Sequence, residues 1–155
     1  FEANAARNYV FYNVRIKNTW AAAGGSSYSM SELRYVNGST TALAVPGTKT
    51  LFAIGANTVR TMAGNETFDK SRANLDKFAI FLDINADGTI QIRPYRDIEV
   101  VQLSGDADYP NKYFIEETSY GSKYGNFLLH YKYKSGTDWY EIKEELRMKI
   151  VDDKL

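Results

Sequence analysis

The residues that most openly suggest chemistry lie in the sequence FLDINADGTI. Asp83, Asn85 and Asp87 alternate ahead of Gly88, as the first ligands and the glycine of an EF-hand calcium loop do. Position 12 of such a loop needs a bidentate glutamate, but Pro94 stands there. Isoleucines also alternate into and out of the motif, which is typical of strands and not of helices. We therefore predict a β-hairpin turn here and no metal site.

His130 is the sole histidine, and the chain has no cysteine. Ser-His-Asp, Cys-His or zinc chemistry would therefore have to use this one imidazole or do without it. His130 alternates out of phase with Phe127, Leu129 and Tyr131, which predicts a solvated side chain on the polar side of a strand. We expect no catalytic residue, no cofactor and no metal.

Two acidic pairs, Glu116-Glu117 and Glu144-Glu145, could serve a glycosidase, which needs two carboxylates. Glu144 is in phase with Ile142 and other apolar residues of the last predicted strand, so it is expected to point inward. An inward carboxylate is costly unless it is hydrogen-bonded or paired. We favour a structural carboxylate, bound by Arg or Tyr or displaced by a bulge, because no second inward carboxylate is recognisable. The functional alternative is an acid or a ligand contact inside a barrel.

Aromatic residues gather near turns and loops in the last third of the chain, above all in the long, tyrosine-rich segment 106–126. Flat rings outside strand cores can stack on sugar faces, and loops often carry binding residues. We expect them to form, in part, a stacking surface for glycans at one end of the fold. The alternative is that the rings fold back as lids. The candidate ligand-binding residues are Tyr109, Tyr113, Tyr120, Tyr124 and Trp139.

Size and charge exclude several classes of protein. A chain of 155 residues is expected to form one domain, residues 1–155, with a core of its own. Nineteen basic and nineteen acidic residues balance, whereas nucleic-acid binders usually carry a basic excess. No apolar run approaches the roughly 20 residues that span a bilayer. The chain begins at Phe1 without a signal-type segment, so any export signal is expected to lie outside these residues.

Apolar and polar residues alternate with a period of two through most of the chain, and twenty-two residues are aromatic (12 Tyr, 8 Phe, 2 Trp). Both features favour strands. Short turns such as Asn37-Gly38 separate the runs, which predicts an all-β fold of eight or nine antiparallel strands, closed as a barrel or folded as a sandwich. Segment 65–78 is expected to be mostly loop, with Asp69 as a weak helix cap. The predicted strand segments are 9–20, 30–39, 48–62 with a turn at 55–57, 77–85, 89–96, 98–103, 125–136 and 139–150.

Residues 47–149 resemble the C-terminal domains of unknown function of Bacteroidetes surface lipoproteins. Those domains share a Lys-Thr-Leu strand, an Ala-Asn-Thr-Val turn, a central hairpin, a Phe-x-Leu-x-Tyr-x-Tyr strand and a closing Glu-x-Leu-x-Arg. The final Glu and Arg spacing differs here by one residue. The matching residues are Lys49-Thr50-Leu51, Ala56-Asn57-Thr58-Val59, Asn85 to Ile90, Phe127, Leu129, Tyr131 and Tyr133, and Glu145-Leu146 with Arg147 or Lys149.

This resemblance implies a lipocalin-like, up-and-down barrel, export, and a lipid-anchored parent protein encoded beside glycan-uptake machinery. It implies no catalytic residue. We expect a non-catalytic accessory or ligand-binding domain at the outer-membrane surface or in the periplasm, with oligo- or polysaccharides as ligands and glycan-uptake proteins as partners. A carrier of a small apolar ligand and a carboxylate-dependent hydrolase are the alternatives. Large side chains should fill a small barrel and so exclude the carrier; they are Phe81, Phe127, Tyr131, Tyr133 and Met148.

Overall fold

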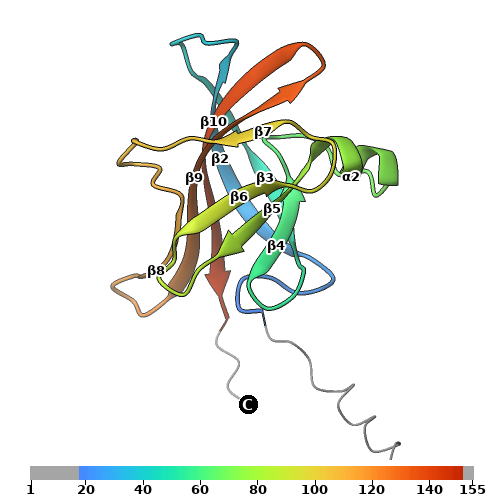
Figure 1. Ribbon diagram of the computed structural model, residues 1–155. Helices are drawn as coiled ribbons and strands as arrows, with labels where there is room; N and C mark the ends of the chain where they lie inside the picture. The colour runs from blue at the N-terminus through green and yellow to red at the C-terminus, as the bar shows by residue number, and fades with distance from the viewer. Residues whose placement is uncertain (1–17, 152–155) are drawn as a thin grey trace, which may run out of the picture.

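The protein folds as a nearly closed antiparallel β-barrel with one short helix, in a computed structural model that describes residues 18–151 (Figure 1). The predicted all-β fold is confirmed, and the barrel replaces the sandwich alternative. Most of the first predicted strand, 9–20, lies outside the described residues, and Trp20 at its end is not in a strand. The elements are β2 (Ser26–Val36), β3 (Leu43–Ala53), β4 (Thr58–Met62), α2 (Arg72–Phe78), β5 (Ala79–Ile84), β6 (Ile90–Pro94), β7 (Val100–Gln102), β8 (Lys112–Glu117), β9 (Lys123–Ser135) and β10 (Asp138–Ile150).

Most strands that follow one another along the chain pair as neighbours in the barrel. The sheet order is β6-β5-β4-β3-β2-β10-β9-β7, and β8 also pairs with β9. The long strand β10 pairs antiparallel with both β9 and β2, so the last strand pairs with the first strand that the structure describes. β7 and β8 share one edge of β9, at Tyr131–Tyr133 and at Lys123–Leu128. β8 lies in the segment 106–126 that was expected to be loop.

Side-chain hydrogen bonds bridge the seam between β6 and β7, where no strand ladder forms among the described residues. The amide of Gln102 accepts from the backbone N–H of Ile92 at 2.8 Å and donates to the carbonyl of Ile90 at 2.9 Å. Below it, the N–H of Tyr113 donates to the carbonyl of Gly88 at 2.8 Å. The buried backbone groups at this edge therefore find partners without a further strand.

The β5–β6 hairpin confirms the turn predicted for residues 83–88. Asp83 in β5 pairs with Gln91 in β6. The turn is closed by a hydrogen bond from the N–H of Asn85 to the carbonyl of Thr89, at 2.9 Å. Gly88 takes a φ of +89°, which only glycine adopts cheaply. The carboxylate of Asp83 pairs with Arg93, whereas Asp87 accepts from Thr89 within the turn, so the two carboxylates have separate partners.

Calcium is therefore not expected to change the stability of this hairpin. We expect the melting temperature of the protein to be the same in millimolar calcium and in a chelator, measured by circular dichroism. A calcium-dependent rise of several degrees that Asp83→Ala abolishes would contradict the hairpin interpretation.

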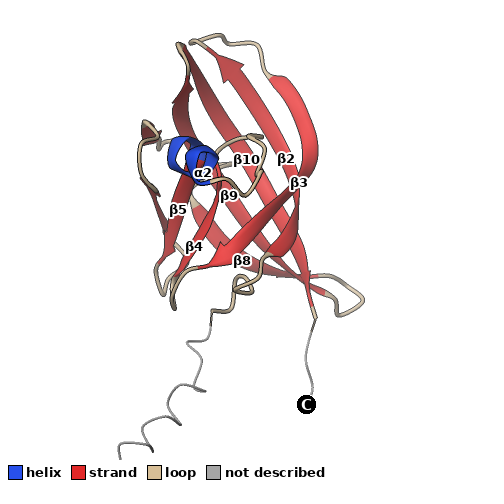
Figure 2. Cartoon of the chain, turned by 90° about the vertical axis from the view of Figure 1, so that its right-hand side faces the viewer, coloured by secondary structure: helices blue, strands red, loops and turns tan. Residues whose placement is uncertain are grey.

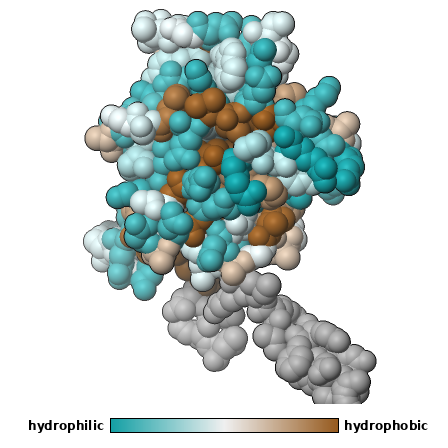
Figure 3. Space-filling view, in the orientation of Figure 1, coloured by the Kyte–Doolittle hydropathy of each residue, from teal (hydrophilic) through white to brown (hydrophobic). Residues whose placement is uncertain are grey.

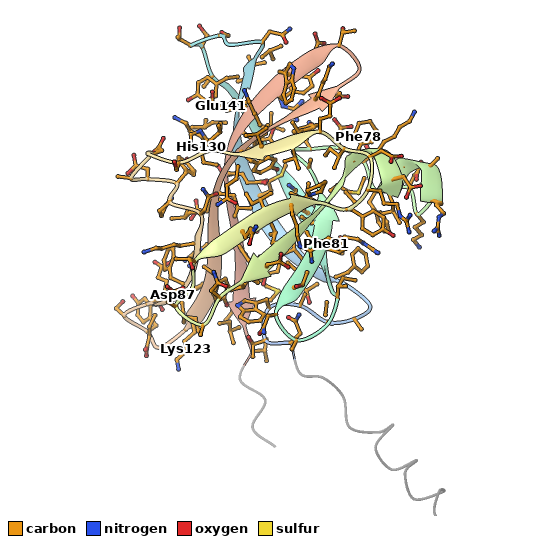
Figure 4. The ribbon with its side chains drawn as sticks, viewed as in Figure 1. Phe78, Phe81, Asp87, Lys123, His130 and Glu141 are labelled. Atoms are coloured by element: carbon orange, nitrogen blue, oxygen red, sulfur yellow. The ribbon has the colours of Figure 1, made fainter. Side chains whose placement is uncertain are left out.

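Inward side chains fill the barrel. Tyr28, Phe127, Tyr131 and Tyr133 are fully buried, and burying a large apolar side chain contributes roughly 1.5–3 kcal/mol. Met148 packs partly buried against the same core. Phe81, however, was wrongly placed inside. Its neighbours in the strand point inward, so Phe81 lies on the outer face, with the guanidinium of Arg93 4.3 Å from its ring centroid (Figure 4).

The helix α2 corrects the expectation that residues 65–78 are mostly loop. Ser71, and not Asp69, is its N-cap: the Ser71 hydroxyl accepts from the N–H of Asn74 at 3.1 Å. Asp69 instead accepts from the N–H of Ser71 at 2.8 Å. No residue of α2 is buried, which explains why its sequence lacks apolar periodicity. The helix lies on the outside of the barrel (Figure 2).

The outer surface mixes residue types. On the face drawn in Figure 3, hydrophobic residues show between hydrophilic ones. Within residues 18–151, no helix is both long enough and apolar enough to cross a membrane.

Candidate functional site

A groove opens in the side of the barrel where β3 and β4 separate. β3 pairs with β2 from Leu43 to Leu51, but with β4 only at Phe52 and Ala53. The loop 63–68, which leads from β4 toward α2, lies beside the unpaired part of β3 and leaves a cavity of about 370 Å³. We call this cavity the β3 groove. Its lining includes Met30, Thr48, Lys49, Asn65, Glu66 and Phe68.

The unpaired edge of β3 presents backbone hydrogen-bonding groups to the groove. The carbonyl of Thr50 accepts from the Thr61 hydroxyl at 2.9 Å, so Thr50 directs its backbone toward β4. Alternate residues of a strand direct their backbone groups to the same edge. Thr48 therefore presents an N–H and a carbonyl to the groove, and Pro46 presents a carbonyl only. A proline at such a position discourages another strand from pairing there.

A buried ion pair lies beneath the groove. Sequence analysis placed Glu144 inward, and its carboxylate is fully buried. One carboxylate oxygen accepts from the ammonium of Lys49 at 2.7 Å, and the other accepts from the Tyr131 hydroxyl at 2.6 Å. The Tyr131 oxygen in turn accepts from the backbone N–H of Gly64 at 2.8 Å. Glu144 thus links β10, β3 and β9 to the loop that forms the groove wall.

A second inward carboxylate, Glu32, was missed by sequence analysis. It is 1% exposed, it stands opposite Glu144 in the β2–β10 register, and it accepts from the guanidinium of Arg34 at 2.9 Å. Burial raises the pKa of Glu32, and the neighbouring charge of Glu144 raises it further, although Arg34 and Lys49 oppose both effects. The signal was available, because Glu32 alternates in phase with Tyr28 in the strand SSYSMSELRYV.

The side chains of the groove wall are positioned by the groups beneath them, which we call the interior network: Glu32, Arg34, Lys49, Tyr131, Tyr133 and Glu144. Arg34 donates to the side-chain oxygen of Asn65. The hydroxyl of Tyr133 donates to the Glu66 carboxylate at 2.8 Å. The guanidinium of Arg34 lies 4.5 Å from the centroid of the Tyr140 ring, which fixes it from the other side. Asn65 is therefore held by the partly buried Arg34, and Glu66 by the buried Tyr133.

His130 is buried, and the prediction of a solvated side chain was wrong. Its side chain does point away from the barrel interior, but loop 103–111 covers it, and the residue is 7% exposed. Its Nε2 atom lies 2.6 Å from the Glu141 carboxylate (Figure 4), and its backbone N–H donates to the side chain of Asn111 at 2.8 Å. Strand phase alone cannot show that a loop folds back over the outer face.

The five candidate stacking residues do not form one surface. Trp139 pairs with Lys134 at one end of β9, and Tyr124 lies ten residues away near the other end, roughly 33 Å at 3.3 Å per residue. Tyr120 lies in the β8–β9 turn and is 94% exposed. The expected stacking surface at one end of the barrel is therefore corrected: the register places its members at both ends.

Two of the five rings pack against partners within the fold. Tyr113 packs on Phe127 with ring centroids 4.8 Å apart. The Arg147 guanidinium lies 3.8 Å from the Tyr124 ring centroid. Tyr109 is half-buried in loop 103–111. Of the five, Tyr120 alone is freely exposed. The residues that line the β3 groove are instead drawn from β2, β3, β4 and loop 63–68.

The groove combines hydrogen-bonding groups with an apolar surface. It offers backbone groups of Thr48, the side chains of Asn65 and Glu66, and the ring of Phe68 within one cavity. No cluster of three or more His, Cys, Asp or Glu suited to a metal ion occurs within residues 18–151. The fold and groove together define an antiparallel β-barrel domain with a lateral pocket.

A protein-family model described as "-like, C-terminal" matches residues 8–147. The chain belongs to this family of C-terminal domains. A comparison with curated proteins gives no match.

Similar solved structures come from Bacteroides ovatus. A structural-genomics protein of unknown function superposes with a TM-score of 0.60 at 18% identity, over 83% of this chain and 48% of that one. A multidomain protein including DUF1735 gives 0.56 at 17% identity, over 83% and 50%. A third, also of unknown function, gives 0.61 at 13% identity, over 85% and 47%. The chain thus spans about half the length of these proteins, and the expected resemblance to a Bacteroidetes domain of unknown function is confirmed.

Proposed function

We propose that this domain is a non-catalytic, carbohydrate-binding part of a larger, lipid-anchored surface protein, and that the sugar binds in the β3 groove. The observation that carries the proposal is the unpaired edge of β3 beside a wall of fixed polar side chains. Concave sites with a few well-placed polar groups are the usual form of small-ligand sites.

Sugar recognition needs hydroxyl partners and an apolar face, and the groove supplies both. Thr48 offers backbone groups, Asn65 offers an amide, and the Glu66 carboxylate accepts from hydroxyls. Phe68, which packs on Phe52 with centroids 5.2 Å apart, provides a supported ring. Because Asn65 and Glu66 are already held by Arg34 and Tyr133, little conformational freedom is lost on binding.

The interior argues against a carrier of an apolar ligand, since large side chains occupy it. A carboxylate-dependent hydrolase is the second candidate, because Glu32 and Glu144 face each other across β2 and β10. Both carboxylates are buried and each pairs with a cation, whereas a hydrolase of this kind needs carboxylates that reach the substrate and a water. We therefore favour binding over catalysis.

The expected setting of the domain stays part of the proposal. Export, a lipid anchor outside these residues and partnership with outer-membrane glycan-uptake proteins are supported by the resemblance to surface lipoproteins. The balanced charge of nineteen basic and nineteen acidic residues supports partners other than nucleic acid.

The test is a titration of the protein with neutral oligosaccharides, followed by calorimetry. We expect a dissociation constant on the order of 0.1–1 mM, and Phe68→Ala is expected to weaken binding about tenfold, which corresponds to about 1.4 kcal/mol. Tyr120→Ala is the matched aromatic control, because Tyr120 lies in the β8–β9 turn outside the groove, and it should leave affinity unchanged. Loss of binding in Tyr120→Ala with full binding in Phe68→Ala would contradict the groove assignment.

A further inference from the structure

We propose that the β3 groove selects glycans that carry a protonated amino group, such as non-acetylated glucosamine units. The inference rests on the proposed function and adds the charge of the ligand. Five charged side chains lie in or beneath the groove. They are Glu32, Arg34, Lys49, Glu66 and Glu144.

Both cations of this set are already used. Lys49 pairs with Glu144 at 2.7 Å, and Arg34 pairs with Glu32 at 2.9 Å. The ammonium of Lys49 is held inward by Glu144, and the side chain of Lys49 is 5% exposed. Lys49 therefore has no freedom to move out toward an acidic sugar.

Glu66 is the carboxylate that remains for a ligand. The Tyr133 hydroxyl donates to it at 2.8 Å and orients the carboxylate without neutralising it, and the charge of Glu66 also contributes to raising the pKa of Arg34. Within residues 18–151, Glu66 forms no ion pair with a lysine, arginine or histidine. A side chain of this kind accepts strongly from a ligand ammonium, since hydrogen bonds between ionised groups are about twice as strong as neutral ones.

Glu32 adds a second observation, because only one of its two carboxylate oxygens is paired with a cation. Its Oε1 atom is buried with no hydrogen-bond partner among the described residues. Glu32 stands opposite Val45 of β3 in the strand register, and Val45 itself lines the groove. Three carboxylates thus face two cations, so a cation in the groove is attracted, whereas a uronate or sulfate is repelled.

The test compares three trisaccharides of the same linkage at pH 6, where an ordinary amine is protonated. They are glucosamine, N-acetylglucosamine and glucose trisaccharides. We expect the glucosamine trisaccharide to bind about tenfold more tightly than the other two, with a preference that weakens as salt is added. Glu66→Gln should abolish the preference, so that the glucosamine trisaccharide binds no more tightly than the other two, because glutamine carries no charge although its oxygen can still accept from Tyr133.

The control is Glu117→Gln, which removes an exposed carboxylate in β8, away from the groove, and should keep the preference. Equal affinities for all three sugars, or a preference that survives Glu66→Gln, would overturn the charge selection and leave carbohydrate binding standing. Failure of all three sugars to bind would overturn both the selection and the proposed function.

Discussion

Replacing Glu144 by alanine is expected to lower the free energy of unfolding by about 3–5 kcal/mol, because it leaves a charged partner buried and unpaired. Lys49 would lose the carboxylate 2.7 Å from its ammonium, and Tyr131 would lose its acceptor at 2.6 Å. Urea unfolding followed by tryptophan fluorescence measures the change. The effect is large because the side chain of Lys49 is only 5% exposed, so water compensates poorly for the lost contact.

Two further variants test whether Lys49 and Glu144 stabilise the fold as a pair. Lys49→Met alone should also destabilise strongly, whereas Lys49→Met combined with Glu144→Leu should cost much less than the sum of the single changes. The exposed pair between Glu116 and Arg147 is the control, and Glu116→Ala should cost less than about 1 kcal/mol. Additive losses for the buried pair would show that Lys49 and Glu144 do not act together.

Much of the barrel follows from local sequence signals. The alternation of apolar residues in the last two strands predicts their inward faces, and the β9–β10 register places Tyr131 and Ile142 side by side in the core. The β5–β6 hairpin follows from a turn sequence and from the absence of a twelfth-position ligand. Such features depend on neighbours along one strand or one turn, which a sequence displays directly.

The groove could not be predicted in this way, because it depends on which strands separate. Pro46 marks one unpaired position of β3, but the sequence does not show that β3 meets β4 only at Phe52 and Ala53 and pairs with β2 alone before them. The pairing of Glu32 with Glu144 likewise depends on the register between β2 and β10, which are more than a hundred residues apart. The alternation within each strand predicts that each carboxylate points inward, but it does not predict that the two stand opposite each other.

The candidate stacking residues also show that strand register cannot be predicted from local sequence. A local excess of tyrosine predicted one stacking surface, yet the β9–β10 register carries Trp139 to one end and Tyr124 to the other. Tyr113 turns onto Phe127 because β8 pairs with β9 at that point. Proximity in sequence is a poor guide to a common surface when long strands run the length of a barrel.

Gly64→Ala is the second change with a large expected effect, a loss of about 2–4 kcal/mol in the free energy of unfolding. Gly64 takes a φ of +52°, in the left-handed region where a side chain is strained. A Cβ atom there would lie 2.7 Å from the Tyr133 hydroxyl oxygen and 2.9 Å from the Nη2 atom of Arg34. Because the Tyr133 ring is fully buried, it cannot swing away without disturbing the core.

The matched control for this change is Gly136→Ala in the β9–β10 turn. Gly136 takes a φ of +65°, but a Cβ atom there would meet nothing within 4 Å, so the control reports the backbone cost alone, about 1–2 kcal/mol. The difference between the two variants measures the clash at Gly64. Gly64→Ala should also weaken sugar binding, because moving Tyr133 releases Glu66 from the groove wall. Equal losses of stability in the two variants, with unchanged binding, would show that loop 63–68 is not held by the interior network.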